Sequence, residues 1–149
     1  MKTTIKTGFA IVIIASAILA SCGKYEEGPK FSLASKKGRV ANEWKVDKYF
    51  QDGVDKTGDY RLVVESETYD YKKDGTYTLT QKFTSLGGNQ TYNESGTWEF
   101  INKNEDLKSL SSQSGATADT MHITRLKSNE MWVKSVSGSP VQELHMISK

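Results

Sequence analysis

Cys22 has the most distinctive reactive side chain in this sequence, because it is the only cysteine among 149 residues. The two histidines, His122 and His145, belong to no His-x-His or Glu-x-x-His arrangement, so the usual ligand cluster of a metal site is missing. Asp52, Asp55 and Asp59 supply carboxylate oxygens of the kind that calcium binds. Their spacing misses the alternate ligands and late glutamate of an EF-hand loop, so we expect a solvated turn.

Other catalytic patterns are also missing. The sequence has no Gly-x-Ser-x-Gly elbow and no phosphate-binding Gly/Lys loop. It therefore predicts no catalytic residue, no metal and no cofactor. Paired carboxylates stay an open route to catalysis, because sequence does not give their separation.

The N-terminus has the order of a secretory signal peptide. Lys2 and Lys6 give a positive start, residues 8–19 are apolar, and the small residues Ala20 and Ser21 follow. The charge-free stretch covers only residues 7–23, and a membrane-spanning helix needs roughly 20 apolar residues. A cleaved signal is therefore expected over residues 1–21.

The end of this segment, Leu19-Ala20-Ser21-Cys22, resembles the lipobox of bacterial lipoproteins. The resemblance implies cleavage just before Cys22 and acyl chains, such as palmitate, on that residue. Each buried CH₂ contributes roughly 0.8 kcal/mol, so two or three chains would anchor the protein stably. Two alternatives stay open: Cys22 is an unmodified small hydrophobe, or cleavage at residues 15–17 leaves its thiol free. A lone free thiol can form no disulfide within its own chain and is a liability in an oxidising compartment, which favours lipidation.

Composition limits the nature of the chain after the signal. Residues 1–21 carry two of the 20 basic side chains and none of the 18 acidic ones, so 18 of each remain. This balance argues against nucleic-acid binding. The 128 remaining residues suffice for one domain, and we expect a flexible tether over 22–40 and a barrel domain over 41–149.

The start of the tether bears on location. Residues 24–27, Lys-Tyr-Glu-Glu, look like the short acidic export tags of some surface lipoproteins, and Gly23 looks permissive for outer-membrane sorting. These likenesses predict an outer-membrane anchor, on the periplasmic face or at the cell surface. The alternative is that residues 24–27 are only a solvated spacer.

From Glu43 onward, apolar and polar residues alternate with the period of a β-strand. Asp74-Gly75 predicts a tight hairpin turn, and Gly96 inside a strand indicates a kink or a close approach. Residues 59–67 could form a short strand or a helical turn over a sheet end. Evenly spaced strands with short turns favour an all-β, up-and-down antiparallel barrel, with a two-sheet sandwich as the alternative. The eight expected strands lie around residues 44–46, 69–72, 76–83, 92–100, 107–110, 120–126, 131–136 and 141–147.

The motifs that carry a family resemblance are the lipobox, the Lys/Glu-rich tether, NEWKV around Trp44, the turn KKDGTY and the strand SGTWEF. Through them, the chain resembles the lipocalin-like domain family of Gram-negative bacterial lipoproteins. The resemblance covers Cys22 to about Ile147. It implies a calycin-type barrel and a small apolar ligand, but no general activity. Lipocalins proper open with Gly-x-Trp, whereas this chain has Asn42-Glu43-Trp44 there and Gly96-Thr97-Trp98 in mid-chain. The barrel is therefore better supported than the ligand.

Aromatic side chains on the inward phase of the expected strands are the candidate ligand-binding residues. They could line a cavity, or they could simply fill an eight-stranded barrel, whose interior is just wide enough for side chains or one small ligand. The candidates are Tyr69, Tyr71, Tyr77, Phe83, Trp98 and Phe100.

These observations lead to two functional hypotheses. The first is a non-catalytic binding module, anchored to the membrane through lipid on Cys22, that carries a small apolar ligand or presents its surface to another molecule. The second is an interaction subunit or inhibitor at the cell envelope, with a filled interior and contacts through Asp52–Asp59 and Ser111–Ala118. An unrecognised hydrolase is a third, and it would need a buried acidic pair or a pairing of His122 with His145.

Overall fold

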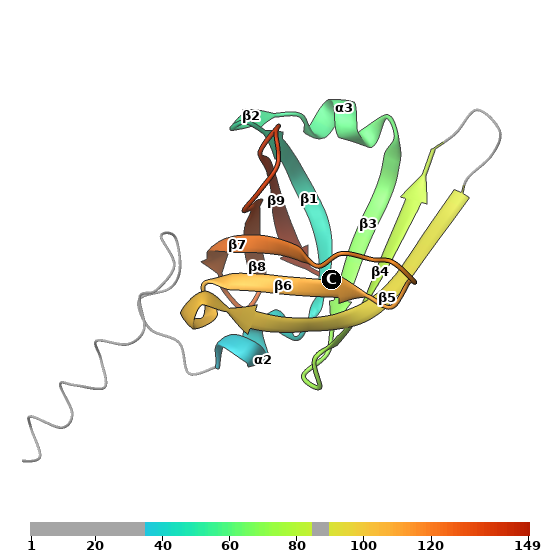
Figure 1. Ribbon diagram of the computed structural model, residues 1–149. Coiled ribbons are helices and arrows are strands. Elements are labelled where there is room, and N and C mark those ends of the chain that lie inside the picture. Colours follow the sequence, from blue (N-terminus) through green and yellow to red (C-terminus); the bar gives the residue numbers. More distant parts are fainter. Residues whose placement is uncertain (1–34, 85–89) are drawn as a thin grey trace, which may run out of the picture.

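Eight antiparallel strands form a closed barrel in the computed structural model, which describes residues 35–84 and 90–149 (Figure 1). Each of these eight strands pairs with the next of the eight along the chain, and β1 (Glu43–Gln51) pairs with β9 (Gln142–Ser148) to close the sheet. Among the described strands, the two-residue β2 (Val54–Asp55) pairs only with β1. The predicted up-and-down barrel is confirmed. The elements are α2 (Lys36–Val40), β1 (Glu43–Gln51), β2 (Val54–Asp55), α3 (Thr57–Arg61), β3 (Val64–Tyr71), β4 (Thr76–Phe83), β5 (Gln90–Ile101), η2 (Asn102–Asn104), β6 (Asp106–Ser111), β7 (Asp119–Leu126), β8 (Glu130–Ser135) and β9 (Gln142–Ser148).

The predictions for the signal peptide, for Cys22 and for the turn at residues 87–89 lie outside the described residues. Within the described ranges, every helix is too short or too polar to cross a membrane.

The β3–β4 hairpin forms as the sequence predicts. Tyr71 pairs with Tyr77 across a turn in which Gly75 has a φ of 93°, a conformation that glycine adopts without strain. The carboxylate of Asp74 accepts hydrogen bonds from the backbone N–H and the hydroxyl of Thr76, at 2.9 and 2.7 Å. These bonds fix the register that turns Tyr69, Tyr71 and Tyr77 to the interior.

Register shifts in three strand pairs change which residues point inward. In β1, Trp44 and Val46 are buried, but a shift after Val46 makes Tyr49 the next buried residue. Similar shifts follow Val64 in β3 and Ile123 in β7. A bulge adds one residue to one strand and so reverses the alternation beyond it. Strict alternation therefore holds only in the segments between these points.

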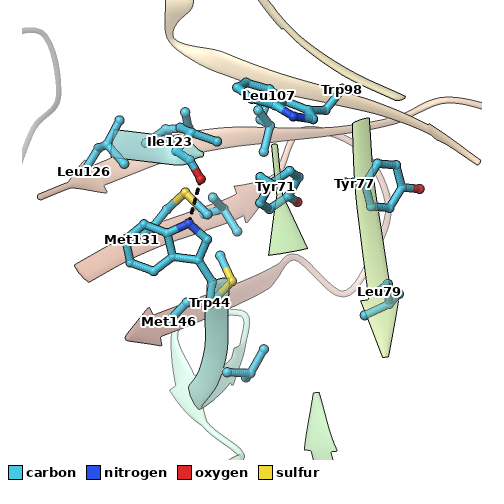
Figure 2. Packing of buried hydrophobic residues seen from close by; sticks show 13 residues of the cluster. Trp44, Tyr71, Tyr77, Leu79, Trp98, Leu107, Ile123, Leu126, Met131 and Met146 are labelled. Atoms are coloured by element: carbon cyan, nitrogen blue, oxygen red, sulfur yellow. Dashed lines mark hydrogen bonds between the residues drawn. The ribbon is translucent and has the colours of Figure 1, made fainter. Parts of the chain in front are cut away.

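One end of the barrel is closed by α2 and the apolar residues beneath it. Ser35 caps this helix by accepting a hydrogen bond from the Gly38 N–H at 3.0 Å. Val40 and Trp44 are fully buried, and the Trp44 indole N–H donates to the Val40 carbonyl at 2.8 Å. Arg39 also packs here and donates to the Leu126 carbonyl at 2.9 Å. Figure 2 shows the indole among the other core side chains.

This packing moves the start of the domain. The sequence predicts a tether through residue 40, but residues 36–40 form a helix whose last two residues, Arg39 and Val40, are buried against the barrel. The physical reason is that Arg39 donates to the Leu126 carbonyl, 87 residues further along the chain, a long-range contact that the local composition does not show.

The opposite end carries α3 and β2 (Figure 1). The ambiguous segment 59–67 contains both a helical turn and the start of a strand, because α3 ends at Arg61 and β3 begins at Val64. Arg61 donates to the backbone carbonyls of Val46, at the register shift of β1, and Glu65, near the start of β3, which fixes α3 against these two strands. Tyr60 of α3 and residues 137–140, between β8 and β9, line a pocket at this end.

Gly96 lies where β4, β5 and β6 approach closely. It pairs with Tyr77 and Ser111, and an added Cβ would lie 2.1 Å from the Leu110 carbonyl oxygen and 2.7 Å from the Tyr77 ring. The close approach predicted for this glycine is confirmed.

Candidate functional site

A pocket of about 510 Å³ opens at the end of the barrel opposite α2. We call it the mouth pocket. Its walls come from strands and loops far apart in the sequence, and its lining is largely tyrosine, carboxyl, amide and hydroxyl side chains. The lining residues are Tyr49, Tyr60, Glu67, Tyr69, Gln81, Asp119, Met121, Ser135, Ser137, Gly138, Ser139, Pro140, Gln142 and Leu144.

A second, smaller space of about 110 Å³ lies deeper in the barrel, and we call it the inner cavity. It shares four lining residues with the mouth pocket: Tyr69, Asp119, Met121 and Leu144. Most of its other walls are apolar or aromatic, namely Tyr71, Tyr77, Leu79, Leu107, Val133 and Met146, with Glu94 and Ser109 as the polar exceptions. The interior thus changes from polar at the mouth to mainly apolar below.

Glu67 is the central polar group of the mouth pocket. Its side chain is buried, with 4% of its surface exposed, and it points inward from β3 in phase with Tyr69 and Tyr71. The Tyr60 hydroxyl donates to one carboxylate oxygen, and the Tyr69 hydroxyl donates to the other at 2.6 Å. Burial raises the pKa of Glu67, although hydrogen bonds from Tyr69 and Gln81 act in the opposite direction. Burial, followed by the nearby Glu67 charge, raises the pKa of Tyr69 well above its usual range.

A second carboxyl also accepts hydrogen bonds from two tyrosines. Glu94 of β5 accepts hydrogen bonds from Tyr77 at 2.5 Å and Tyr92 at 2.8 Å. Gln113 extends the network by donating to the Tyr92 hydroxyl at 3.0 Å. Burial and the hydrogen bond to Glu94 raise the pKa of Tyr77, and the bond to Glu94 also raises the pKa of Tyr92, so both tyrosines stay neutral donors.

The charges around this interior have one sign. Glu67 and the exposed Asp119 line the mouth pocket, and Glu94 and Asp119 line the inner cavity. Among the described residues that line either space, none is lysine, arginine or histidine. When they are ionised, carboxylates inside low-dielectric walls focus a negative potential on the cavity.

Five of the six candidate aromatic residues lie in one chain of ring contacts. Tyr71 is its centre, with ring centroids 5.8 Å from Tyr69, 5.9 Å from Tyr77 and 5.7 Å from Trp98, and Phe100 lies 5.6 Å beyond Trp98. Tyr69, Tyr71 and Tyr77 line the inner cavity, which places them where a ligand could contact them.

The other candidates have different surroundings. Trp98 is a core residue whose indole N–H donates to the Lys72 carbonyl at 2.9 Å. Phe83 lies at the far end of β4, paired with Val64 and Gln90. That any of the six binds a ligand stays a prediction.

The two histidines have separate partners. His122 Nδ1 lies 2.6 Å from a carboxylate oxygen of Asp106, and His145 Nε2 lies 2.6 Å from one of Glu143. His145 also stacks on Trp132 with ring centroids 3.9 Å apart. Each histidine is thus held by its own neighbouring carboxylate.

The aspartates of the segment 52–59 also point to separate partners. Asp52 accepts from the Val141 N–H and Asp55 from the Thr57 N–H, both at 2.9 Å, while Asp59 pairs with a lysine. Across residues 35–84 and 90–149, no three His, Cys, Asp or Glu side chains are grouped to hold a metal ion.

Glu67→Gln is expected to change how stability depends on pH. The pKa of Glu67 lies above its ordinary value of 4.5, so the folded protein holds this proton more tightly than the unfolded chain does. The protonated Glu67 side chain therefore contributes to the stability of the fold. This contribution is complete below pH 4.5 and is lost as the pH rises through the raised folded-state pKa. Relative to Glu67→Gln, the wild type should therefore lose unfolding free energy as the pH rises. Urea unfolding from pH 4 to 8 measures this difference.

The control is Glu65→Gln, which changes an exposed carboxyl on the same strand. Parallel pH profiles for the wild type and Glu67→Gln would contradict the prediction.

The fold and its two cavities define a closed antiparallel β-barrel with an accessible, ligand-sized interior. No protein-family model matches this chain, and no curated protein matches it either.

Proposed function

We propose that this protein is a non-catalytic binding module of the bacterial cell envelope, anchored to the outer membrane through lipid on Cys22, whose barrel holds a small ligand. The observation that carries the ligand proposal is the mouth pocket of about 510 Å³ above the inner cavity. Small-molecule sites are typically pockets of roughly 300–1,000 Å³ that combine apolar walls with a few convergent polar groups. Here the mouth pocket supplies the volume and the polar groups, and the inner cavity supplies the apolar walls. The apolar part of such a ligand would occupy the inner cavity.

Native mass spectrometry of protein purified from its own host tests ligand binding. The expected result is a fraction of molecules with an added small-molecule mass beyond that of the lipid, removable by mild denaturation. A homogeneous protein with no added mass after gentle purification would count against a carrier role.

The anchor proposal rests on the N-terminal sequence pattern. The Cys22→Ser variant is expected to lose all metabolic labelling by an alkyne-bearing fatty acid, because the acyl chains need the cysteine. It should also fail to yield the mature chain that begins at residue 22. Gel fluorescence and intact mass measure the two effects.

Ser21→Ala is the matched control, because it keeps a small residue before the cysteine and should still be labelled and processed. Persistent labelling of Cys22→Ser, or a mature mass equal to that of the wild type after correction for the substitution, would contradict the anchor.

A further inference from the structure

We propose that the mouth pocket selects a small organic cation, an ammonium group on a compact apolar body, with the Glu67 carboxylate as its counter-ion. This inference rests on the proposed function, since it names the class of ligand for the same pocket.

The hydrogen-bonding capacity of Glu67 leaves room for such a ligand. Each of its two carboxylate oxygens accepts from one tyrosine, Tyr60 or Tyr69. The Gln81 amide is a third hydrogen-bond partner of Glu67. Two carboxylate oxygens offer about four acceptor positions, so about one remains after these three bonds. An ammonium group carries N–H donors and no acceptor, so it can donate to this remaining position. The two tyrosines also hold the carboxylate in a fixed orientation within the pocket.

The charge balance of the pocket favours a cation over neutral or anionic ligands. The titratable side chains that line it are Glu67 from β3, Asp119 from β7 and the tyrosines Tyr49, Tyr60 and Tyr69. A buried carboxylate without a positive partner is costly, and a bound ammonium would supply that partner. An anionic ligand would instead meet two carboxyl groups.

The basic residue of α3 does not supply this charge. The Arg61 guanidinium lies 5.9 Å from the centre of the Tyr60 ring, but it donates to the backbone carbonyls of Val46 and Glu65. It is also absent from the described lining of the mouth pocket. The carboxyl groups of the pocket therefore have no basic side chain beside them among the described lining residues, although an arginine lies nearby.

Aromatic rings and cavity size define the rest of the ligand. Tyr49 and Tyr60 stack with ring centroids 4.7 Å apart, and both line the pocket with Tyr69. Tyrosine rings attract organic cations through the negative face of the π system. The inner cavity of about 110 Å³ is somewhat smaller than the roughly 150 Å³ apolar cavity that is known to accept benzene. The inner cavity therefore limits the apolar body to at most a single ring or a short branched chain.

The test compares three probes of nearly equal shape on the full-length chain in non-ionic detergent, by isothermal titration calorimetry at pH 7. The probes are 2-phenylethylammonium, the neutral 2-phenylethanol and the anionic 3-phenylpropionate, each also titrated into empty micelles. The ammonium should bind at least about tenfold more tightly than the alcohol, as expected for a hydrogen bond to a charged group, and the anion should bind most weakly.

The variants locate the effect. Glu67→Gln keeps the side-chain shape and should weaken ammonium binding at least about tenfold, while Glu65→Gln on the same strand should leave it unchanged. Asp119→Asn, at an exposed position that folding can tolerate, should weaken binding to a smaller extent. If Glu67→Gln does not fold, the three probes on the wild type together with Asp119→Asn decide the question.

Several outcomes would overturn this inference: no ammonium binding at millimolar concentration, equal affinity for ammonium and alcohol, or unchanged ammonium binding by a folded Glu67→Gln. Tightest binding of the alcohol or the anion would overturn the cation inference and still support a ligand-binding barrel. A co-purified neutral ligand together with failed ammonium binding would separate the two proposals in the same way.

Discussion

Trp44→Ala is expected to lower the free energy of unfolding by about 3–5 kcal/mol, the usual cost of removing a fully buried tryptophan. Trp44 has no exposed surface, and it packs with Val40, Met131 and Met146 at the closed end of the barrel. Truncation would leave a cavity there and remove the indole donor of the Val40 carbonyl. Since domains are stable by only about 5–15 kcal/mol in total, this loss is severe. Urea unfolding followed by far-ultraviolet circular dichroism measures it.

Trp44→Phe separates packing from hydrogen bonding. Phenylalanine keeps most of the buried apolar area but leaves the Val40 carbonyl without its donor, which costs about 1–3 kcal/mol. We therefore expect a smaller loss than for Trp44→Ala. A loss below about 1 kcal/mol for Trp44→Ala would mean that this end of the barrel is not packed as described.

Gly96→Ala is expected to be nearly as damaging, although it adds only one methyl group. The new Cβ would lie 2.1 Å from the Leu110 carbonyl oxygen and 2.9 Å from its carbon, and these are backbone atoms that move only if β6 moves. Overpacking typically costs about 1–3 kcal/mol where neighbours can yield. At a rigid backbone contact we expect the upper end of that range or more. Thermal and urea unfolding measure the change.

Gly58→Ala is the matched control, because nothing lies within 4 Å of a Cβ at this position in α3. Alanine is better than glycine in a helix by about 0.5–1 kcal/mol, so this variant should be neutral or slightly more stable. If Gly96→Ala were as stable as the wild type, the close packing of β5 on β6 would be contradicted.

The fold could be predicted from sequence wherever the signals were local. Asp74-Gly75 specifies its own turn, and the alternation on both sides of it determines which residues face the core, as Tyr71 and Tyr77 show. Gly96 could be singled out because a glycine inside a strand usually marks a bend or the close approach of a neighbouring chain segment. Such features depend on a few consecutive residues.

The candidate site was only partly predictable. Tyr69, Tyr71 and Tyr77 followed from alternation, and Glu67 has the same inward phase, a signal that could have identified it. Tyr49 could not be found this way, because the bulge after Val46 reverses the phase of β1.

Other members of the site depend on contacts that the chain makes only when folded. Tyr60 comes from a short helix, and it reaches Glu67 only because α3 is fixed over the open end. Asp119 begins β7 just after a Ser/Gly-rich loop, and nothing in that stretch indicates a cavity wall. Closure of the barrel brings these residues together.

The position of α2 has a consequence for the direction in which the barrel faces. Ser35, the N-cap of α2, lies at the end of the domain opposite the mouth pocket and follows Cys22 by thirteen residues, a reach of at most about 45 Å. With lipid on Cys22, the chain would therefore enter the domain at the end opposite the mouth pocket. This arrangement lets the mouth pocket point away from the bilayer. Such an orientation suits capture of a solute from the aqueous phase rather than extraction of a molecule from the lipid leaflet.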